Sequence, residues 1–212
     1  MGVHVVMIRL KDLDKNDIEV ISHHVADAFW DYEYSNGDLG LKKYITTRDA
    51  MFTYINAIVK AAYNSGLLYA TSENHEGYMF IAGEGIGTIG FFDGMKMISA
   101  EKKALGGWKK MKQFVSDSFS DGGSIETRMR KAKRKFIRIE VLIVRKEYQK
   151  QGFMRKMMES VYDLAGKQKV PVILDTDDEN KSARYQHLGM TLERIRDCGD
   201  HYHTYDLIRE PV

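Results

Sequence analysis

The segment 136–176 constrains the fold more than any other part of the sequence. FIRIEVLIV (136–144) is rich in β-branched and aliphatic residues and predicts a strand that stops abruptly. A polar loop at 145–153 leads into a helix, and PVILDT (171–176) predicts the next strand. Because a helix joins the two strands, we expect them to form a parallel or splayed neighbouring pair. The chain is therefore predicted to be an α/β protein with a mixed sheet.

The remaining sequence adds helices and strands on both sides of this segment. Further strands are predicted at 4–10, 67–72, 77–83, 191–196 and 201–208, the second and third of which form a hairpin. Asp14 and Asp49 are each suited to start a helix. With only two prolines and no Ser/Gly-rich linker, residues 1–212 are predicted to form a single domain.

Residues 84–135 do not follow this pattern. The sequence from residue 95 predicts two helices separated by Gly106-Gly107, and a run of basic residues follows between Arg128 and Lys135. That run is either a solvated helix face or an anion-binding patch. Residues 85–90 match Gly-x-Gly-x-x-Gly formally, but no helix with apolar periodicity is expected to open there, as a dinucleotide site requires.

Composition excludes several classes of function. A net charge of +2 gives no polycationic surface for nucleic acid. The single cysteine, Cys198, rules out an internal disulfide and fits the cytoplasm. The N-terminus becomes charged by residue 9, too early for a secretory signal, and no apolar run reaches the roughly 20 residues of a membrane helix. We expect a cytoplasmic protein that binds neither membrane nor nucleic acid.

The loop at 145–153 has the features of an anion site. The first turn of a helix exposes N–H groups that lack intrahelical partners, and the helix dipole adds positive potential there. Gly152 has no Cβ, so the main chain can approach phosphate oxygens closely. Lys150, Arg155 and Lys156 add positive charge nearby. A polar connector with one convenient glycine is the simpler interpretation.

Two motifs in the correct order resemble those of the GCN5-related N-acetyltransferases. QKQGFM (149–154) is similar to the (Gln/Arg)-x-x-Gly-x-(Gly/Ala) signature of that family, and it lies between a strand and a helix as the family requires. The segment 180–190 resembles the Asn-…-Tyr-x-x-(Leu/Met)-Gly-(Phe/Met) motif that follows the next strand. Met154 departs from the signature, which has a small residue at that position. The resemblance covers 136–209 well, 67–83 loosely and says little about 84–135.

The resemblance implies a fold and a cofactor. The fold would be a mixed, mostly antiparallel central sheet with splayed parallel strands and flanking helices, and 84–135 would be a helical insertion that helps to shape the acceptor site. Acetyl-CoA would be the acyl donor and would lie between strands 136–144 and 171–176. The residues implied to bind it are Leu142, Ile143 and Val144 through the pantetheine arm, Gln149, Lys150, Gln151, Gly152, Phe153, Met154 and Arg155 at the pyrophosphate, and Asn180. Asn180 is equally suited to cap the helix that follows it.

The resemblance also implies catalytic residues. Tyr185 matches the tyrosine that protonates the departing CoA thiolate in many members, although it could simply pack in the core. The family's usual base position is occupied by Arg138. Glu140, two residues on, shares a face with Arg138 and could act as the base or form a salt bridge with it. Trp108, Phe114 and Phe119 would either wall the acceptor site or pack the insertion.

Other polar clusters leave alternatives open. DTDDE (175–179) could attract a cationic amine, or it could be the acidic N-terminus of a helix. The pairs His23-His24 and His201/His203 have no carboxylate or cysteine at ligand spacing, so no metal is expected.

We therefore expect an acyl-CoA-dependent N-acyltransferase. It would transfer acetyl to a primary amine by direct attack in a ternary complex, most simply with a small-molecule acceptor, and the family also allows a homodimer. A non-catalytic CoA-binding or regulatory module of the same fold is the alternative.

Overall fold

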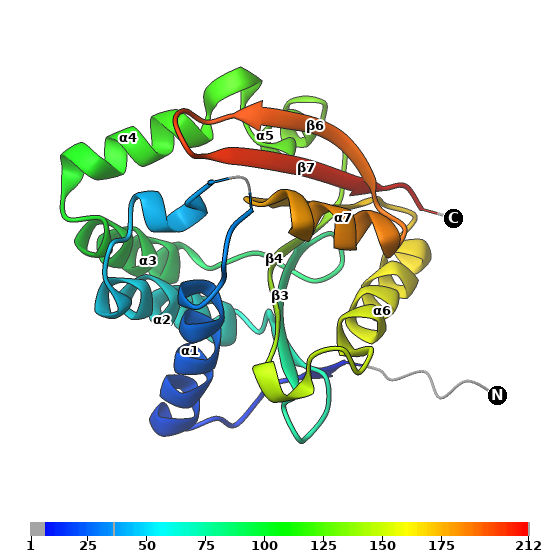
Figure 1. Cartoon of the computed structure of the whole chain (residues 1–212). Helices are drawn as coiled ribbons and strands as arrows, with labels where there is room; N and C mark the ends of the chain where they lie inside the picture. Colours follow the sequence, from blue (N-terminus) through cyan, green and yellow to red (C-terminus); the bar gives the residue numbers. More distant parts are fainter. Residues whose placement is uncertain (1–6, 36, 212) are drawn as a thin grey trace.

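The computed structural model describes residues 7–35 and 37–211, which form a sheet of seven strands with helices packed on it (Figure 1). In chain order the elements are β1 (Ile8–Arg9), α1 (Lys15–Trp30), α2 (Arg48–Asn64), β2 (Leu68–Ala70), β3 (Gly77–Gly83), α3 (Phe91–Ala104), α4 (Trp108–Ser118), α5 (Ile125–Lys131), β4 (Ile137–Val144), α6 (Phe153–Gln168), β5 (Val172–Thr176), α7 (Glu179–His187), β6 (Thr191–Asp197) and β7 (His203–Arg209). The strand order is β1-β2-β3-β4-β5-β7-β6. Among these strands β4 and β5 are parallel and the other neighbours antiparallel, which confirms the predicted mixed, mostly antiparallel sheet.

The parallel pair separates soon after it begins. β4 and β5 are paired at Ile137↔Val172 and Arg138↔Ile173, and their register goes no further. On the other side of β4, the register with β3 shifts so that Glu140 has no partner residue. An extra residue of this kind is a β-bulge, which bends a strand and redirects its side chains. The bulge therefore lies where the two strands diverge.

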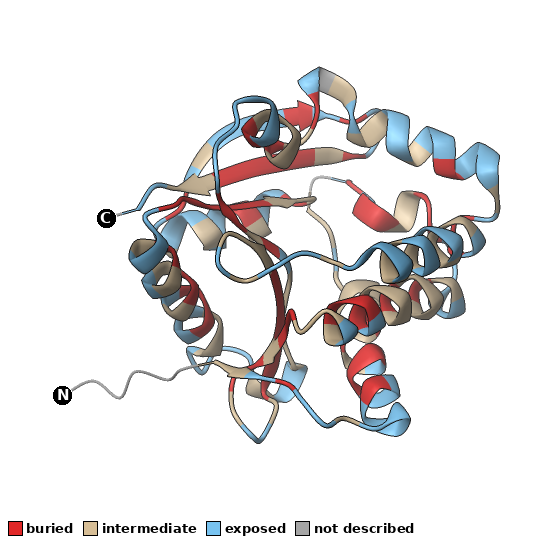
Figure 2. Ribbon diagram, turned by 180° about the vertical axis from the view of Figure 1, so that it is seen from behind, coloured by how far each residue is buried: buried red, intermediate tan, exposed pale blue. Residues whose placement is uncertain are grey.

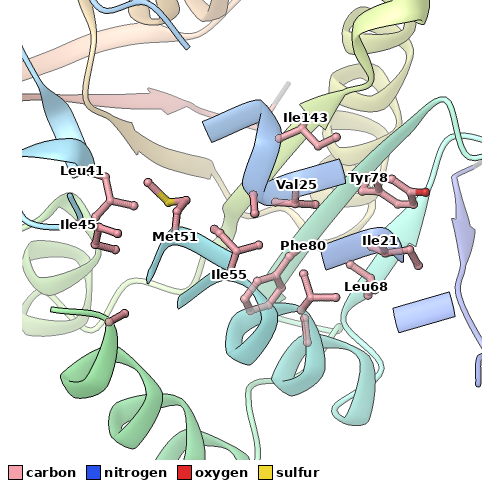
Figure 3. Close-up of a cluster of buried hydrophobic side chains, with 14 of the residues drawn as sticks. Ile21, Val25, Leu41, Ile45, Met51, Ile55, Leu68, Tyr78, Phe80 and Ile143 are labelled. Carbon is pink, nitrogen blue, oxygen red and sulfur yellow. The ribbon is translucent and has the colours of Figure 1, made fainter. Parts of the chain in front are cut away.

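Two hydrophobic cores lie on opposite faces of the sheet. The larger packs α1 and α2 onto β2, β3 and β4, and its central side chains include Ile21, Val25, Ile55, Phe80 and Ile143 (Figure 3). The other packs α6 against β3, β4, β5 and β7. The inward faces of α1 and α6 are buried and their outward faces exposed (Figure 2). Each such aliphatic side chain contributes about 1.5–3 kcal/mol by leaving water.

The segment between β3 and β4 differs in detail from its prediction. α3 begins at Phe91, directly after Gly90, which is four residues before the start predicted at residue 95. The first turn was left out because its apolar residues, Phe91 and Phe92, are 75% and 77% exposed and so do not continue an inward-facing apolar stripe. The break at Gly106-Gly107 is confirmed. At the N-terminus, the predicted strand 4–10 is reduced to β1 within the described residues, and residues 4–6 lie outside them.

The basic run Arg128–Lys135 is largely paired within the protein. Arg128 pairs with Asp206 at 2.8 Å and Arg130 with Glu126 at 2.7 Å. Arg134 and Lys135 reach Glu210 and Glu84 in the same way. Paired cations hold little attraction for an external anion, so the structure favours the solvated, paired face over an anion-binding patch.

The acidic segment after β5 fixes the long loop between α1 and α2. Asp178 accepts hydrogen bonds from the Tyr32 hydroxyl at 2.7 Å and from both the amide and the hydroxyl of Ser35 at 2.7 Å. Asp177 accepts from the Tyr34 hydroxyl at 2.6 Å and pairs with Lys181 at 2.7 Å. These carboxylates are therefore committed to the protein, and the predicted acidic mouth for a cationic amine is not formed by them.

Asp178 should contribute more stability than an ordinary helix cap. It is fully buried and also caps α7 by accepting from the amides of Asn180 and Lys181. We expect Asp178→Ala to lower the free energy of unfolding by about 2–4 kcal/mol, because a cap and several charge-assisted hydrogen bonds are lost together. Denaturant titration measures this, and Asp14→Ala, which removes the exposed cap of α1, should cost only about 1 kcal/mol.

The same carboxylate gives a pH dependence. Burial opposes its ionisation, but the hydrogen bonds from Ser35, Tyr32 and Lys181 prevail and lower the pKa of Asp178 to about 2 from an ordinary value of 3.8. A lowered pKa contributes stability that is present above pH 3.8 and lost as the pH falls toward 2. The loss of stability that Asp178 causes between pH 3.8 and 2 should be absent in Asp178→Ala. If Asp178→Ala and Asp14→Ala lowered the free energy of unfolding equally, the role of Asp178 in fixing the loop between α1 and α2 would be contradicted.

Candidate active site

The loop from β4 to α6 has an unusual backbone. Lys150 and Gly152 both adopt positive φ values, of 62° and 83°. A Cβ added to Gly152 would meet no atom within 4 Å, so open space lies beside it. Gly152 is the N-cap residue of α6, and no side chain caps that helix. By contrast, side chains cap α1, α2, α5 and α7.

Six consecutive amides in this loop lack a hydrogen-bond acceptor among the described residues. They run from Lys150 to Arg155, and the first bond of the helix is donated by Lys156 to the Gly152 carbonyl at 3.1 Å. Alternating left- and right-handed backbone turns successive N–H groups toward one point and forms an anion-binding concavity. The helix dipole of α6 adds to its positive potential.

The two glutamines hold this loop in place. Gln149 Nε2 donates to the Val144 carbonyl at 3.2 Å, and Gln151 Nε2 donates to the Glu147 carbonyl at 3.0 Å. The side chains of Lys150 and Arg155 are exposed. Phe153 packs edge-on to the ring of Tyr148, and Met154 is half-buried in the first turn of α6. The polar side chains thus shape the loop, and the free donors belong to its backbone.

β4 offers an open edge beside the loop. The Arg145 amide donates to the Glu76 carbonyl at 2.9 Å, which sets the alternation of the ladder with β3. In an antiparallel pair, every second residue turns its N–H and C=O away from the partner strand. Leu142 and Val144 therefore turn their backbone groups toward the side from which β5 has diverged. Ile143, predicted to do the same, directs its backbone groups to β3.

Tyr185 and Asn180 lie on α7. Tyr185 is half-buried and packs on the core under α6, and no described residue hydrogen-bonds to its hydroxyl. Burial, together with the charge of Asp177, raises the pKa of Tyr185 above that of an ordinary phenol, so it stays protonated. Asn180 is exposed in the first turn of α7. It does not cap the helix, since Asp178 fills that role.

Glu140 projects from the bulge of β4. Its side chain is 27% exposed, and Oε2 lies 3.0 Å from Arg138 Nε. The contact is not a hydrogen bond, and Arg138 Nε is therefore left without a hydrogen-bond partner. Arg138 instead donates through its terminal nitrogens to Glu126 and to Asp175. Burial raises the pKa of Glu140, opposed by the charge of Arg138. Glu140 thus keeps its oxygen lone pairs available while it lies beside a cation.

Arg138 belongs to a chain of alternating charges on this face of the sheet. In order, the members are Arg130, Glu126, Arg138, Asp175, Arg196, Asp206, Arg128 and Glu193. Arginines and carboxylates are equal in number, so the chain is neutral as a whole. Glu140 is an additional negative charge attached to it.

Two tyrosines beside these charges were missed by sequence reasoning. Tyr54 on α2 and Tyr202 before β7 have no hydrogen-bond partner for their hydroxyls among the described residues. Asp175 acts electrostatically on both phenols, and Tyr54 also acts on Tyr202. Nothing in their local sequence distinguishes them, since aromatic residues at these positions would equally fit a core.

The predicted histidine pairs and insertion aromatics do not join this site. His203 Nδ1 contacts Asp38 at 3.1 Å, and His23 stacks on Phe52. Phe114 packs edge-on to Tyr44 at 5.0 Å between ring centres, whereas Trp108 and Phe119 are each 58% exposed. Of the alternatives for these aromatics, Phe114 packs the insertion onto the core. Within the described part of the chain, no helix is long and apolar enough to cross a membrane.

Known proteins share this sequence pattern and this fold. Residues 48–190 match the sequence model of the acetyltransferase (GNAT) family. Similar solved structures include a histone acetyltransferase HPA2 and related acetyltransferase from Corynebacterium glutamicum, with 9% identity, a TM-score of 0.59 and coverage of 98% of this chain and 96% of that one. A putative arylalkylamine N-acetyltransferase 7 from the yellow fever mosquito has 11% identity, a TM-score of 0.58 and coverage of 94% and 85%.

A GNAT family acetyltransferase from Listeria monocytogenes is similar at 14% identity and a TM-score of 0.51, over 97% of this chain and 94% of that one. At such identities the likeness establishes the fold alone. No curated protein sequence matches the chain. The family match spans the open strand edge, the loop and α7, and the chain therefore belongs to the GNAT family of acetyltransferases.

Proposed function

We propose that the protein is an N-acyltransferase that uses acetyl-CoA and transfers the acetyl group directly to a primary amine. One observation carries this proposal most: six consecutive free amides, from Lys150 to Arg155, lie beside the open edge of β4. A pyrophosphate needs several converging donors, and an extended amide-containing arm needs a strand edge. Family membership supports the same donor.

The donor would be held mainly by backbone. The amides of the loop bind the pyrophosphate, and the backbone groups of Leu142 and Val144 pair with the pantetheine arm. Asn180 is exposed at the start of α7 and lies in the part of the chain that the family model matches. Because the donors are main-chain groups, bulky Met154 is compatible with binding as long as its side chain turns away.

Glu140 and Tyr185 have separate roles in this reaction. Glu140 accepts the proton of the acceptor ammonium, and the neutral nitrogen attacks the thioester carbon to form a C–N bond. As the C–N bond forms, the nitrogen becomes acidic and releases its second proton to solvent. The C–S bond then breaks, and the Tyr185 hydroxyl donates its proton to the departing thiolate. Glu140 and Tyr185 regain their starting states by returning and taking up a proton through solvent.

A covalent enzyme intermediate is not part of this proposal. Cys198 is 1% exposed, and its sulfur contacts the Thr204 hydroxyl at 3.2 Å. A nucleophile must reach its substrate and have a base beside it. Cys198 meets neither condition, so direct transfer in a ternary complex is the simpler route.

Release of thiol from acetyl-CoA tests the proposal. The purified protein would be mixed with acetyl-CoA and a panel of small amines, amino acids and peptides, and free CoA followed by its thiol. Amine-dependent release supports the transferase. Binding of acetyl-CoA without release from any amine would favour a non-catalytic CoA-binding module.

Glu140→Gln should lower kcat/KM about tenfold near neutral pH, because the variant has no base for the acceptor proton. The loss is limited because the attacking nitrogen becomes acidic as it bonds, so water can also take its proton. The deficit should shrink at higher pH, where more amine is already neutral. A pH profile of kcat/KM measures this, and a deficit that is constant with pH would assign Glu140 to structure alone.

A further inference from the structure

Large apolar side chains that face solvent gather on α3 and α4. Seven of the ten large apolar residues that are exposed in the described chain lie between residues 91 and 119. Much of both helices is exposed (Figure 2), and they lie at the opposite end of the molecule from α6 (Figure 1). A monomeric protein rarely exposes a contiguous apolar patch that has no binding role.

On α3 these side chains form one stripe. Phe91, Met95 and Ile98 recur at the spacing of a single helical face. Phe92 packs edge-on to Phe91, with 5.6 Å between the ring centres. Asp93 marks the other side of the helix, because its carboxylate accepts a hydrogen bond at 2.9 Å from the asparagine that ends α2. The stripe therefore points away from α2 and into solvent.

α4 continues this apolar surface. Trp108 and Val115 lie along one side of the helix, and Phe119 follows at its C-cap, whereas Met111 is buried in the core. The Lys102 ammonium, near the end of α3, lies 5.1 Å from the centre of the Trp108 ring. That contact joins the two stripes where the chain turns. The two stripes together are called the α3–α4 face.

The charges around the α3–α4 face are separated by sign. Residues 91–119 contain six lysines, no arginine and three acidic residues. All three acidic side chains are at least half-buried, and two of them bond to the protein, Asp93 to α2 and Asp117 to a core tyrosine. Among the six lysines, only Lys96 has an ion-pair partner within the described chain, Asp93 at 3.6 Å. The exposed lysines are Lys96, Lys103, Lys109, Lys110 and Lys112.

This arrangement indicates the chemistry of the partner. The basic run Arg128–Lys135 is paired within the protein, but the lysines of α3 and α4 keep their attraction for an external anion. A second copy of this chain would bring a like-charged face against them. A nucleic acid would match the charge, but it would leave Met95 and Ile98 against a polar backbone, and it favours arginine. An anionic lipid surface matches both properties, because its phosphates border an apolar interior.

We propose that the α3–α4 face binds the surface of an anionic lipid bilayer. Its apolar side chains enter the boundary between headgroups and acyl chains, where phenylalanine and tryptophan are typical. The lysines lay their aliphatic stems along that boundary and keep their ammonium groups among the lipid phosphates. The proposal goes beyond the proposed transferase function and uses no residue of β4, α7 or the loop before α6.

This mode of binding differs from the insertion of a spanning helix. The expectation that the chain does not bind a membrane rested on the lack of roughly 20 consecutive apolar residues, which a spanning helix needs. An interfacial helix lies in the plane of the bilayer and needs only one apolar face with cationic residues beside it. α3 and α4 each present such a face.

Co-sedimentation with lipid vesicles tests the proposal. The full-length protein would be mixed with vesicles of phosphatidylcholine alone, or of equimolar phosphatidylcholine and phosphatidylglycerol. We expect binding to the anionic vesicles to be tighter by about tenfold or more and to weaken as salt is raised, because the lysines and the lipid phosphates attract each other. Equal binding to the two kinds of vesicle, or binding to neither, would overturn the proposal.

Two double variants separate the apolar and the charged contributions. Phe91→Ser/Phe92→Ser should lower the affinity for anionic vesicles by about tenfold or more and leave its salt dependence unchanged, since apolar area is lost. Lys109→Gln/Lys110→Gln should lower the affinity by a similar factor and also reduce its salt dependence. All four side chains are exposed, so both variants should keep the thermal unfolding of the wild type.

Matched controls lie outside the α3–α4 face. Val20→Ser changes an exposed apolar residue on α1, and Lys167→Gln changes an exposed lysine on α6. Both controls should bind anionic vesicles as the wild type does. Losses as large in the controls as in the two double variants, or double variants that bind like the wild type, would overturn the proposal.

Trp108 reports whether the apolar side chains enter the bilayer. The chain has two tryptophans, so Trp108 is the only one in Trp30→Phe. Its fluorescence should shift to shorter wavelength on binding anionic vesicles, and lipids brominated in the acyl chains should quench it. Binding without shift or quenching would mean adsorption by charge alone and would overturn the proposal.

Sedimentation equilibrium distinguishes a lipid surface from a second copy of the chain. We expect the wild type and Phe91→Ser/Phe92→Ser to have the same oligomeric state in the absence of lipid. A wild-type dimer that is lost in this double variant would assign the α3–α4 face to self-association and would overturn the proposal.

Discussion

Tyr185→Phe should lower kcat for acetyl transfer by about 10- to 1,000-fold while the affinity for CoA changes little. The variant loses one hydroxyl, and with it the proton donor for the departing thiolate. The phenylalanine keeps the packing of the half-buried ring on the core under α6. The steady-state rate of thiol release measures kcat, and titration with CoA measures binding separately.

The pH profile strengthens this test. Because burial and Asp177 raise the pKa of Tyr185, its proton is present throughout the usual assay range, and no basic limb near neutral pH should come from it. Tyr69→Phe is the matched control, since Tyr69 is also half-buried and packs on the same core from β2. Unchanged turnover in Tyr185→Phe would remove Tyr185 from the mechanism.

Local sequence was enough to predict the shape of the loop between β4 and α6. The loop before α6 is a continuous stretch, and its properties follow from a glycine in a left-handed conformation and a helix without a side-chain cap. The hairpin of β2 and β3 and the crossover from β4 to β5 are likewise set by nearby residues. Short-range patterns of turn residues and alternation report such features directly.

The surroundings of Glu140 depend on contacts that local patterns do not report. Alternation predicted that Arg138 and Glu140 share a face, and their ion pair confirms that, but the bulge at Glu140 has no signature in the strand itself. Asp178 is joined to Tyr32 across 146 residues of chain. The run DTDDE therefore read equally well as a substrate mouth and as a helix start. In the structure Asp178 of this run caps α7, and its other hydrogen bonds fix a loop that is distant in the sequence.

Glu101 shows the same limit most clearly. In sequence it is one acidic residue among the lysines of α3, where a solvent-exposed charge is the ordinary expectation. The helix departs from that expectation, because its large apolar residues Phe91, Met95 and Ile98 are exposed whereas Glu101 is half-buried. A hydrophobic pattern assigns the inward face by apolar content. When the outward face is the more apolar one, that rule places the polar residue on the wrong side.

Gly152→Glu should reduce the affinity for CoA by about 100-fold or more, equivalent to about 2.7 kcal/mol, without unfolding the protein. A Cβ at Gly152 has nothing within 4 Å in the free protein, so the substitution meets no steric clash there. A non-glycine residue in left-handed backbone costs about 1–2 kcal/mol, and Lys150 already adopts that conformation two residues earlier. The cost to folding is therefore modest, and the cost to binding is large.

Three effects act together against the ligand in this variant. The Cβ prevents close approach of phosphate, the carboxylate repels it, and the same carboxylate can accept from the free amides of α6 as a capping residue would. Gly152→Ala retains only the first effect and should fall between the wild type and Gly152→Glu. Calorimetric titration with CoA would rank the three proteins.

The matched control is Gly106→Glu. Gly106 also has a positive φ, of 79°, and a Cβ there meets only the Lys110 side chain, no closer than 3.8 Å. The Gly106→Glu substitution has a similar backbone cost but lies far from the loop. The thermal unfolding of this variant should therefore resemble that of Gly152→Glu, while its affinity for CoA stays as in the wild type. A folded Gly152→Glu protein with normal CoA affinity would remove the pyrophosphate from this loop, because no other feature of the helix start can bind it once the amides are capped from within.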